Sequence, residues 1–158
     1  IFKLYNEAYA PLYGTTLLSD EQVQMYIDSF FGFVNPHFIK LILNAEDEMI
    51  GFGLTFPSLS KAMKKAGGKL FPFGFMHILR SIKKNDTLDL YVVAIKPEYQ
   101  GSGAAALLID SIMKSAIAHG MTIGETGPEL EDNRAVQTMW KHFNTRVHRR
   151  RQIFIKDI

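Results

Sequence analysis

The sequence predicts a mixed α/β fold, in which a sheet of parallel and antiparallel strands is flanked by helices. Two strand-like segments, 38–43 and 49–56, are separated by the polar turn 45–48, which is the pattern of an antiparallel hairpin. From residue 88 to about 143, strand and helix patterns alternate, which favours parallel pairing through helical crossovers. Together the two patterns predict one mixed sheet with helices on both faces.

Two helices are expected before the hairpin. Residues 1–13 carry apolar side chains at helical spacing, and Pro11 and Gly14 end that pattern. Ser19 or Asp20 can cap a second helix, which Asn35-Pro36 ends and whose apolar positions are Met25, Tyr26, Phe30 and Phe33. In the second hairpin strand, Gly51 and Gly53 indicate a bulge or a close backbone approach.

The middle of the chain predicts a helical insertion. Residues 60–69 are rich in lysine and form a short helix that Gly67-Gly68 ends, and helical spacing resumes over 76–84. Between them, 71–75 is an aromatic cluster, which either packs the core of the insertion or lines a substrate pocket. Asn85-Asp86 predicts a turn before the next strand.

The second half opens with an apolar strand over 88–95 and a long helix over 103–119, which Gly120 ends in a left-handed conformation. A short strand over 121–125 and an acidic loop over 128–132 follow. We expect Asp132 to cap a helix that reaches about Phe143, and Asn144 to take a left-handed conformation after it. Alternation at Val147, Ile153 and Ile155 predicts one final strand, or two with a bend, over 145–158.

Length and composition predict a single domain over 1–158. The 158 residues are 47% hydrophobic and 22% charged, as in ordinary soluble globular proteins, and no apolar run reaches the roughly 18–20 residues that span a bilayer. The net charge of +2 is too small to indicate nucleic-acid binding. Without cysteine, the chain has no disulfide, thiolate metal site or cysteine nucleophile, which suits a cytoplasmic location. Because the first residue is Ile1, we expect a processed chain or part of a longer one.

The turn between the strand 88–95 and the long helix carries the first functional signal. It reads Gln-Gly-Ser-Gly-Ala-Ala over 100–105. A helix that begins in such a loop offers unpaired N–H groups and the positive end of its dipole to an anion, so we expect a phosphate-bearing ligand. It is neither a Walker loop nor a dinucleotide fingerprint, because no Gly-Lys-Ser/Thr and no third glycine follow. A plain strand-to-helix turn is the alternative.

With the strand before it and the later helix that Asn133 opens and Trp140 occupies, this turn resembles the GNAT superfamily of acyl-CoA-dependent N-acyltransferases, as a bacterial-type member. The family signature, Arg/Gln-x-x-Gly-x-Gly/Ala, corresponds to Gln100, Gly103 and Ala105. The resemblance covers about 38–145, and 1–37 would supply the first two helices. It implies the GNAT fold, with a splayed central sheet. The family's first strand is missing ahead of Ile1, which again indicates an incomplete chain.

The resemblance implies acetyl-CoA as co-substrate. The pyrophosphate would lie on the amides of the turn, and backbone groups near Val93 and Ile95 would pair with the pantetheine arm. Asn133 would bind the pantetheine or phosphate region, or else only cap its helix. Trp140 stands where many members place a proton-donating tyrosine; it walls the thioester pocket or is a core aromatic. The expected cofactor-binding residues are thus Val93, Ile95, Gln100, Gly101, Ser102, Gly103, Ala104, Ala105, Asn133 and Trp140.

Three residues are candidates for proton transfer. Asp89 and Tyr91 share strand parity with Val93 and so are expected to line the same cleft, and Glu125 ends the neighbouring strand. Either carboxylate could act as general base towards an ammonium acceptor, or be a solvated surface charge. Because an indole is no proton source, the departing thiolate would take its proton from Tyr91 or from water.

The basic run 148–151 reads as a strand with outward basic side chains, or as a phosphate or nucleic-acid patch. The five histidines do not cluster, so we expect no metal. The resemblance implies direct transfer of an acetyl group from acetyl-CoA to a small-molecule or peptide amine, and we expect no nucleic-acid or membrane partner. The oligomeric state stays open, a homodimer included. The alternative is a non-catalytic GNAT-fold module with a CoA-binding, regulatory or interaction role.

Overall fold

The computed structural model describes residues 1–30 and 35–156, so the position predicted for Phe33 lies outside the described residues. The chain divides into two compact units, 1–125 and 126–158, and each is described here by itself. The single domain that composition predicts stays a prediction.

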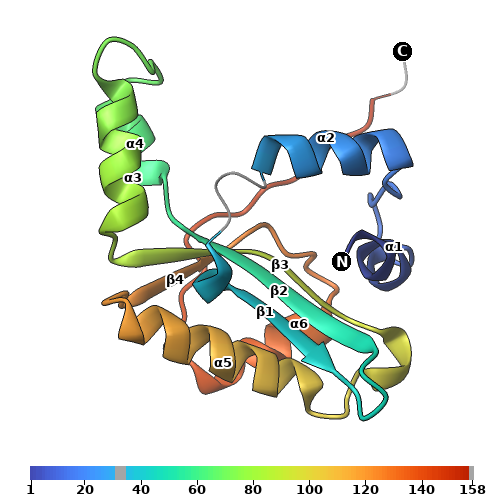
Figure 1. Ribbon diagram of the computed structural model, residues 1–158. Coiled ribbons are helices and arrows are strands. Elements are labelled where there is room, and N and C mark those ends of the chain that lie inside the picture. The colour runs from blue at the N-terminus through green and yellow to red at the C-terminus, as the bar shows by residue number, and fades with distance from the viewer. Residues whose placement is uncertain (31–34, 157–158) are drawn as a thin grey trace. The chain divides into compact units, whose positions relative to one another are not determined.

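Four strands form one mixed sheet, in the order β1-β2-β3-β4 (Figure 1). β1 pairs with β2 and β2 with β3, both antiparallel, so the predicted hairpin is confirmed. The strand bounds are β1 Ile39–Leu43, β2 Met49–Pro57, β3 Thr87–Ile95 and β4 Ile123–Thr126. The predicted mixed α/β class is therefore correct.

The helices of the first unit begin and end close to the predicted positions: α1 Phe2–Tyr9, α2 Asp20–Phe30, α3 Ser60–Lys65, α4 Gly74–Lys83 and α5 Ala104–Ala118. Ser19 caps α2, because its Oγ accepts from the Gln22 amide while the Gln22 side chain accepts from the Ser19 amide. Gly120 ends α5 at φ +77°, and the Met121 amide reaches back to the Ala116 carbonyl.

α5 covers one face of the sheet and carries much of the core. Leu108, Ile109 and Ile112 are almost fully buried against β1, β2 and β3. The helix comes so close to β2 that a Cβ on Gly53 would lie 2.7 Å from Ile112 Cδ1. The close approach that the sequence indicated at Gly53 is confirmed.

α1 packs on the opposite face. Leu4 lies buried there with Phe52 of β2 and Ala94 of β3, and both tyrosines of the helix pack around them. Tyr5 and Tyr9 stack with ring centroids 4.6 Å apart. The helix is tied to the segment before α2 because Asn6 exchanges two hydrogen bonds with the backbone of Leu18.

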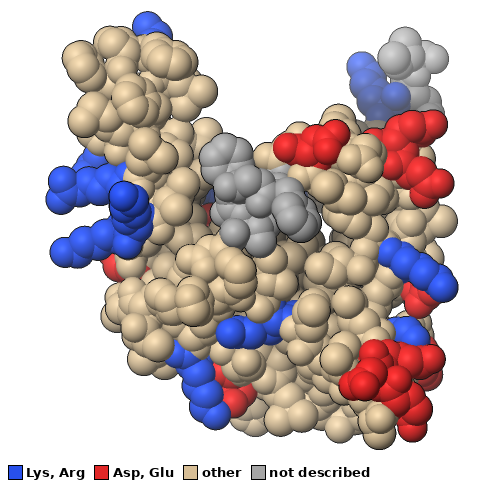
Figure 2. Space-filling view, in the orientation of Figure 1, with Lys and Arg blue, Asp and Glu red and all other residues tan. Residues whose placement is uncertain are grey.

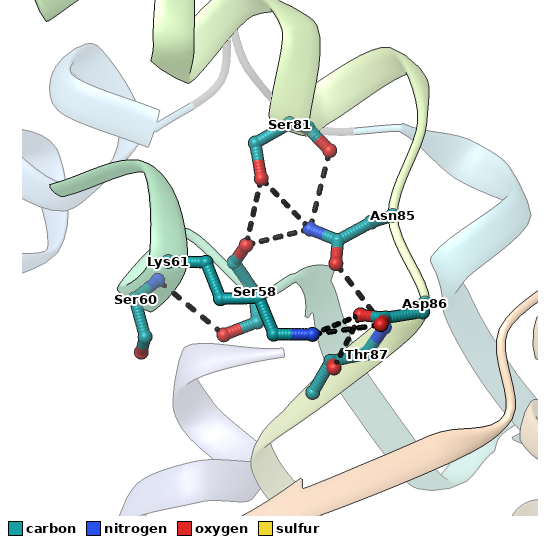
Figure 3. A network of polar contacts seen from close by, with 7 residues as sticks. All are labelled: Ser58, Ser60, Lys61, Ser81, Asn85, Asp86 and Thr87. Carbon is teal, nitrogen blue, oxygen red and sulfur yellow. Dashed lines mark hydrogen bonds and ion pairs between the residues drawn. The ribbon is translucent and has the colours of Figure 1, made fainter. Parts of the chain in front are cut away.

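A polar network anchors α3 and α4 to the start of β3 (Figure 3). The Ser58 carbonyl accepts from Ser81 Oγ at 3.0 Å and from Asn85 Nδ2 at 2.6 Å, while Lys61 forms an ion pair with Asp86 at 2.7 Å. These contacts join residues about 25 positions apart, so they fix the start of α3 and the end of α4 to the start of β3.

The second unit differs from the expectations. Its helix α6 is short, Arg134–Met139, followed by the 3₁₀ turn Trp140–His142. Asn133, not Asp132, caps α6 by accepting from the Val136 amide, because Asn133 is the residue directly before the first turn. Asn144 does not have a positive φ, since the chain leaves the 3₁₀ turn through Phe143 in an extended conformation.

The predicted C-terminal strand is wrong over the described residues 145–156, none of which is in a strand. The side chains that suggested it, Val147, Ile153 and Ile155, are 78–91% exposed. Alternation marks a strand only where a neighbouring strand supplies hydrogen bonds and a buried face, and these residues have neither. Over the described residues, no helix has the length and hydropathy needed to cross a membrane.

Burial predicts how much stability the protein loses when each of two adjacent leucines on α5 is replaced by alanine. Leu108→Ala should lower the free energy of unfolding by about 2–5 kcal/mol, because it leaves a cavity between α5 and the sheet. Leu107 is 69% exposed, so Leu107→Ala should cost less than about 1 kcal/mol and serves as the matched control. Urea unfolding followed by circular dichroism measures both, and equal losses would contradict this core.

Candidate functional site

The turn between β3 and α5 needs glycine at two positions. Gly101 and Gly103 have φ of +79° and +90°, a region that other residues enter at a cost. A Cβ at either position would meet no protein atom within 4 Å. Backbone conformation, not crowding by the protein, therefore selects glycine here, and the space beside both residues is open.

The start of α5 lacks a side-chain cap, because Gly103 occupies the N-cap position. Within the described part of the chain, the amides of Gly101, Gly103, Ala105 and Ala106 have no acceptor. The Ala104 amide has only a long contact, 3.4 Å, to Ser102 Oγ. A 15-residue helix thus presents free N–H groups and its positive end at one point, which is suited to an anion.

The end of β3 carries a second set of backbone groups beside this turn. The Lys96 amide donates to the Ile50 carbonyl at 2.8 Å, which makes these two residues a hydrogen-bonded pair. Because such pairs alternate along an antiparallel ladder, Ile95 and Val93 turn their backbone N–H and C=O groups away from β2.

The carbonyls on this outer edge are already occupied. Tyr9 Oη donates to the Val93 carbonyl at 3.1 Å, and Gln100 Nε2 donates to the Ile95 carbonyl at 3.3 Å. β4 begins beside Asp86, whose carbonyl accepts from the Ile123 amide, and its four residues reach only to about Leu90. Within the first unit, the Val93 and Ile95 carbonyls beyond Leu90 therefore each already accept a hydrogen bond, while the amides of the same two residues remain as donors.

Asp89 lies in an unusual environment for a carboxylate. Its Oδ1 is buried and accepts no hydrogen bond within the described chain. Burial raises the pKa of the Asp89 carboxyl, a hydrogen bond from the Ser58 side chain opposes that shift, and the negative charge of Glu125 adds to it. Two of the three predicted catalytic residues are therefore close enough to interact electrostatically.

Tyr91, the third, is the extra residue of a β-bulge. Leu54 pairs with Val92 and Thr55 with Leu90, so Tyr91 has no partner on β2. Its ring packs edge-on against Phe56, the residue opposite Asp89, with centroids 5.7 Å apart.

The bulge breaks the strand parity predicted for Asp89, Tyr91 and Val93. Val93 pairs with Gly53 and so faces α5, whereas Tyr91 packs with Phe56 on the other face. The expectation that all three side chains line one face is wrong, because the inserted residue shifts the alternation by one.

Asn133 and Trp140 belong to the second unit. The Asn133 side chain caps α6, and Trp140 Nε1 donates to Glu129 Oε1 at 2.8 Å. The Trp140 ring packs edge-on against Phe143. Each side chain thus has a partner within its own unit, and their predicted roles towards a cofactor stay predictions.

Three residues beside the site were missed from the sequence: Tyr9, Phe56 and Ser58. Helical spacing predicts that Tyr9 is buried, but nothing in it indicates a bond to a carbonyl 84 positions away. Phe56 follows from the register of β2 and β3. Among the described residues, no group of three His, Cys, Asp or Glu side chains is arranged to hold a metal ion.

Comparisons with known proteins agree with this geometry. No curated protein matches the chain. A probable acetyltransferase of known structure has a TM-score of 0.62 at 16% identity, with 99% of this chain and 89% of that chain covered. Glucosamine-6-phosphate N-acetyltransferase from Arabidopsis thaliana has a TM-score of 0.55 at 11% identity, covering 98% and 89%.

Diaminobutyrate acetyltransferase EctA from Paenibacillus lautus, solved with its substrate and coenzyme A, has a TM-score of 0.53 at 17% identity, covering 88% of this chain and 66% of that chain. At these identities the solved structures establish the fold, and together with the family they support acyl-CoA N-acetyltransferase activity in general. The sequence model of the Acetyltransferase (GNAT) family matches residues 1–144, and the chain belongs to that family.

Proposed function

We propose that this protein transfers an acetyl group from acetyl-CoA to an amine by direct attack in a ternary complex. The observation that carries the proposal is the outer edge of β3, where both carbonyls accept a hydrogen bond and the Val93 and Ile95 amides point away from β2 with no acceptor among the described residues of the first unit. That edge leads, through the 3₁₀ turn Pro97–Tyr99 and the glycine turn, to the uncapped N-terminus of α5. A row of donors ending at an anion site fits a ligand with amide carbonyls, a thioester and a pyrophosphate.

Each part of the cofactor has a counterpart in this row. The pyrophosphate suits the amides of Gly101, Gly103, Ala105 and Ala106, which have no acceptor in the described chain. The pantetheine arm would extend beside β3 as an added strand. A backbone amide at Val93 or Ile95 would donate to the thioester oxygen, which becomes negative when the carbonyl carbon is attacked.

Asp89 supplies the base. An ammonium acceptor would give one proton to the Asp89 carboxylate, and the amine lone pair would then form a bond to the thioester carbon. When the tetrahedral intermediate collapses, the nitrogen gives its second proton to water, the C–S bond breaks and the thiolate leaves. The raised pKa of Asp89 brings the carboxylate closer to the working pH of a general base. Its buried Oδ1, which lacks a hydrogen-bond donor, would gain one in the ammonium.

The same surroundings favour a cationic acceptor. Asp89 and Glu125 place two carboxylates near one another, and the Phe56–Tyr91 ring pair lies beside Asp89 on the sheet. Carboxylates and aromatic faces both attract an ammonium group. Tyr91 is 67% exposed and so accessible to a ligand.

The thiolate would take its proton from Tyr91 or from water. Trp140 is unsuited to this step, because an indole N–H is not acidic and Glu129 already accepts it. The lack of an acidic proton donor at Trp140 favours a second candidate function, a non-catalytic module that binds CoA. An assay of thiol release over a panel of cationic amines separates the two: turnover supports the enzyme, and binding without turnover supports the module.

The anion site can be tested with two glycines at opposite ends of α5. Gly103→Glu places a carboxylate at the free amides and should weaken acetyl-CoA binding at least about tenfold, measured by calorimetric titration. Gly120→Glu is the matched control, because Gly120 has a similar positive φ and equally open surroundings. Equal affinity of the two variants would contradict a pyrophosphate site at this turn.

Asp89→Asn should reduce turnover of an amine by about 100-fold or more, because the base is lost. The raised pKa stabilises the folded protein at low pH, and that contribution is lost as the pH rises through the raised pKa. The variant should therefore be at least as stable as the wild type at pH 7, and the acid limb of the pH–rate profile should disappear.

Asp86→Asn provides the contrasting control three residues away. Lys61, followed by Thr87, lowers the pKa of Asp86, so its contribution to stability is present above the ordinary pKa of 3.8 and lost as the pH falls through the lowered value. This variant should lose stability at pH 7 and keep its turnover. Unchanged turnover in Asp89→Asn would remove Asp89 from the mechanism.

A further inference from the structure

We propose that the pair of helices α3 and α4, with the loop between them, docks on an anionic lipid surface. We call residues 60–84 the arm. In Figure 1 it projects from the sheet, with the loop 66–73 at its far end. This inference does not depend on acyl transfer, and it departs from the sequence expectation that no membrane partner exists.

The charge of the arm is one-sided. Its 25 residues contain six lysines and one arginine and no Asp or Glu, although the whole chain carries a net charge of only +2. The remaining residues therefore carry 11 basic against 16 acidic side chains, a net charge of −5. Within the described chain, Lys61 is the only one of the seven cations that forms an ion pair. Such a cluster attracts anionic headgroups, with about 1 kcal/mol for each cation near the surface.

The end of the arm is apolar and exposed. Phe71 and Phe73 in the loop are 79% and 68% exposed. The other large apolar side chains of the arm that are more than a third exposed are Met63, Leu70, Phe75, Met76 and Leu79. In Figure 2 the end of the arm is mostly tan, with blue side chains gathered closer to the sheet. An apolar end followed by cations is the arrangement of a segment that enters the headgroup layer.

The spacing matches that layer. Arg80 lies six residues along α4 from Gly74, which is about 9 Å at the helical rise of 1.5 Å per residue. Phenyl rings inserted at the acyl boundary would hold Arg80 near the phosphates, with Lys83 and Lys84 further out at the end of the helix. An open hollow of about 410 Å³ beside α3 and α4 offers room for a headgroup. Its lining includes Lys61, Lys65, His77, Arg80 and Lys84, together with the carboxylate of Asp86 and with Gly120.

The composition favours lipid over a protein or nucleic-acid partner. Lysine is depleted at protein–protein interfaces, yet the arm that carries this apolar end contains six lysines. Nucleic acid would use the cations and stack on the phenyl rings, but it would leave the exposed Leu70, Met76 and Leu79 without apolar contact. Acyl chains and anionic headgroups satisfy both sets of side chains.

Vesicle sedimentation of the whole chain tests the proposal. The protein should sediment with vesicles of phosphatidylcholine that contain about 30 mol% phosphatidylglycerol. The fraction that sediments with phosphatidylcholine alone should be at least about tenfold smaller. Phe71→Ser with Phe73→Ser should reduce binding to the anionic vesicles at least about tenfold, because two inserted rings are lost. Lys64→Gln with Lys65→Gln should reduce it as well and weaken its dependence on salt.

The matched control is Leu107→Ser with Ile117→Ser, which removes two side chains of similar exposure, 69% and 70%, from α5. It should bind like the wild type, with circular dichroism showing that every variant is folded. The proposal is overturned by equal binding of the phenylalanine variant and this control, or by absence of binding to anionic vesicles. If the protein does not bind vesicles but binds RNA, the arm is a nucleic-acid site. If it does not bind vesicles but self-associates, and the phenylalanine variant abolishes this, the arm contacts a second copy of the chain.

Discussion

The hydrogen bond from Tyr9 to the Val93 carbonyl is the constraint on which the proposed site depends. It joins α1 to β3 across 84 residues and occupies the acceptor at the centre of the open strand edge. Burial raises the pKa of the Tyr9 phenol, so the hydroxyl keeps its proton and remains a donor. Gln100 does the same for the Ile95 carbonyl, so that both carbonyls are engaged while the two amides remain as donors. A ligand that brings carbonyl and phosphate oxygens then meets no competing acceptor.

The bulge at Tyr91 organises the rest of the site. By inserting one residue, it lets Val93 pair with Gly53 on the α5 face while Tyr91 and Phe56 pack on the other. It also lies where β4 stops accompanying β3, so the paired and the open parts of this edge meet at the same residue. One local irregularity thus separates the strand segment that holds Asp89 from the segment that would hold the cofactor.

Local patterns in the sequence predicted the elements but not the contacts between them. The spacing of apolar residues located α5, and Gly101 and Gly103 located the turn, because these signals depend on neighbouring residues. The roles of Tyr9 and Ser58 depend on contacts made only in the folded chain. The prediction that Asp89 and Val93 face the same side of the sheet was wrong, because no residue type in the strand indicated the bulge at Tyr91. The prediction of a C-terminal strand was wrong because Ile153 and Ile155 alternate but are exposed, with no strand beside them.

The most direct measurement of the central claim is a titration of the ¹⁵N-labelled protein with acetyl-CoA, followed by NMR of the backbone amides. The account predicts that the amides of Val93, Ile95, Gly101 and Gly103 shift together and become protected from hydrogen exchange. Those of Leu41 and Ile42 in β1, at the opposite edge of the sheet, should not change. Binding that leaves the Val93 and Ile95 amides unshifted would contradict the claim that this edge receives the cofactor.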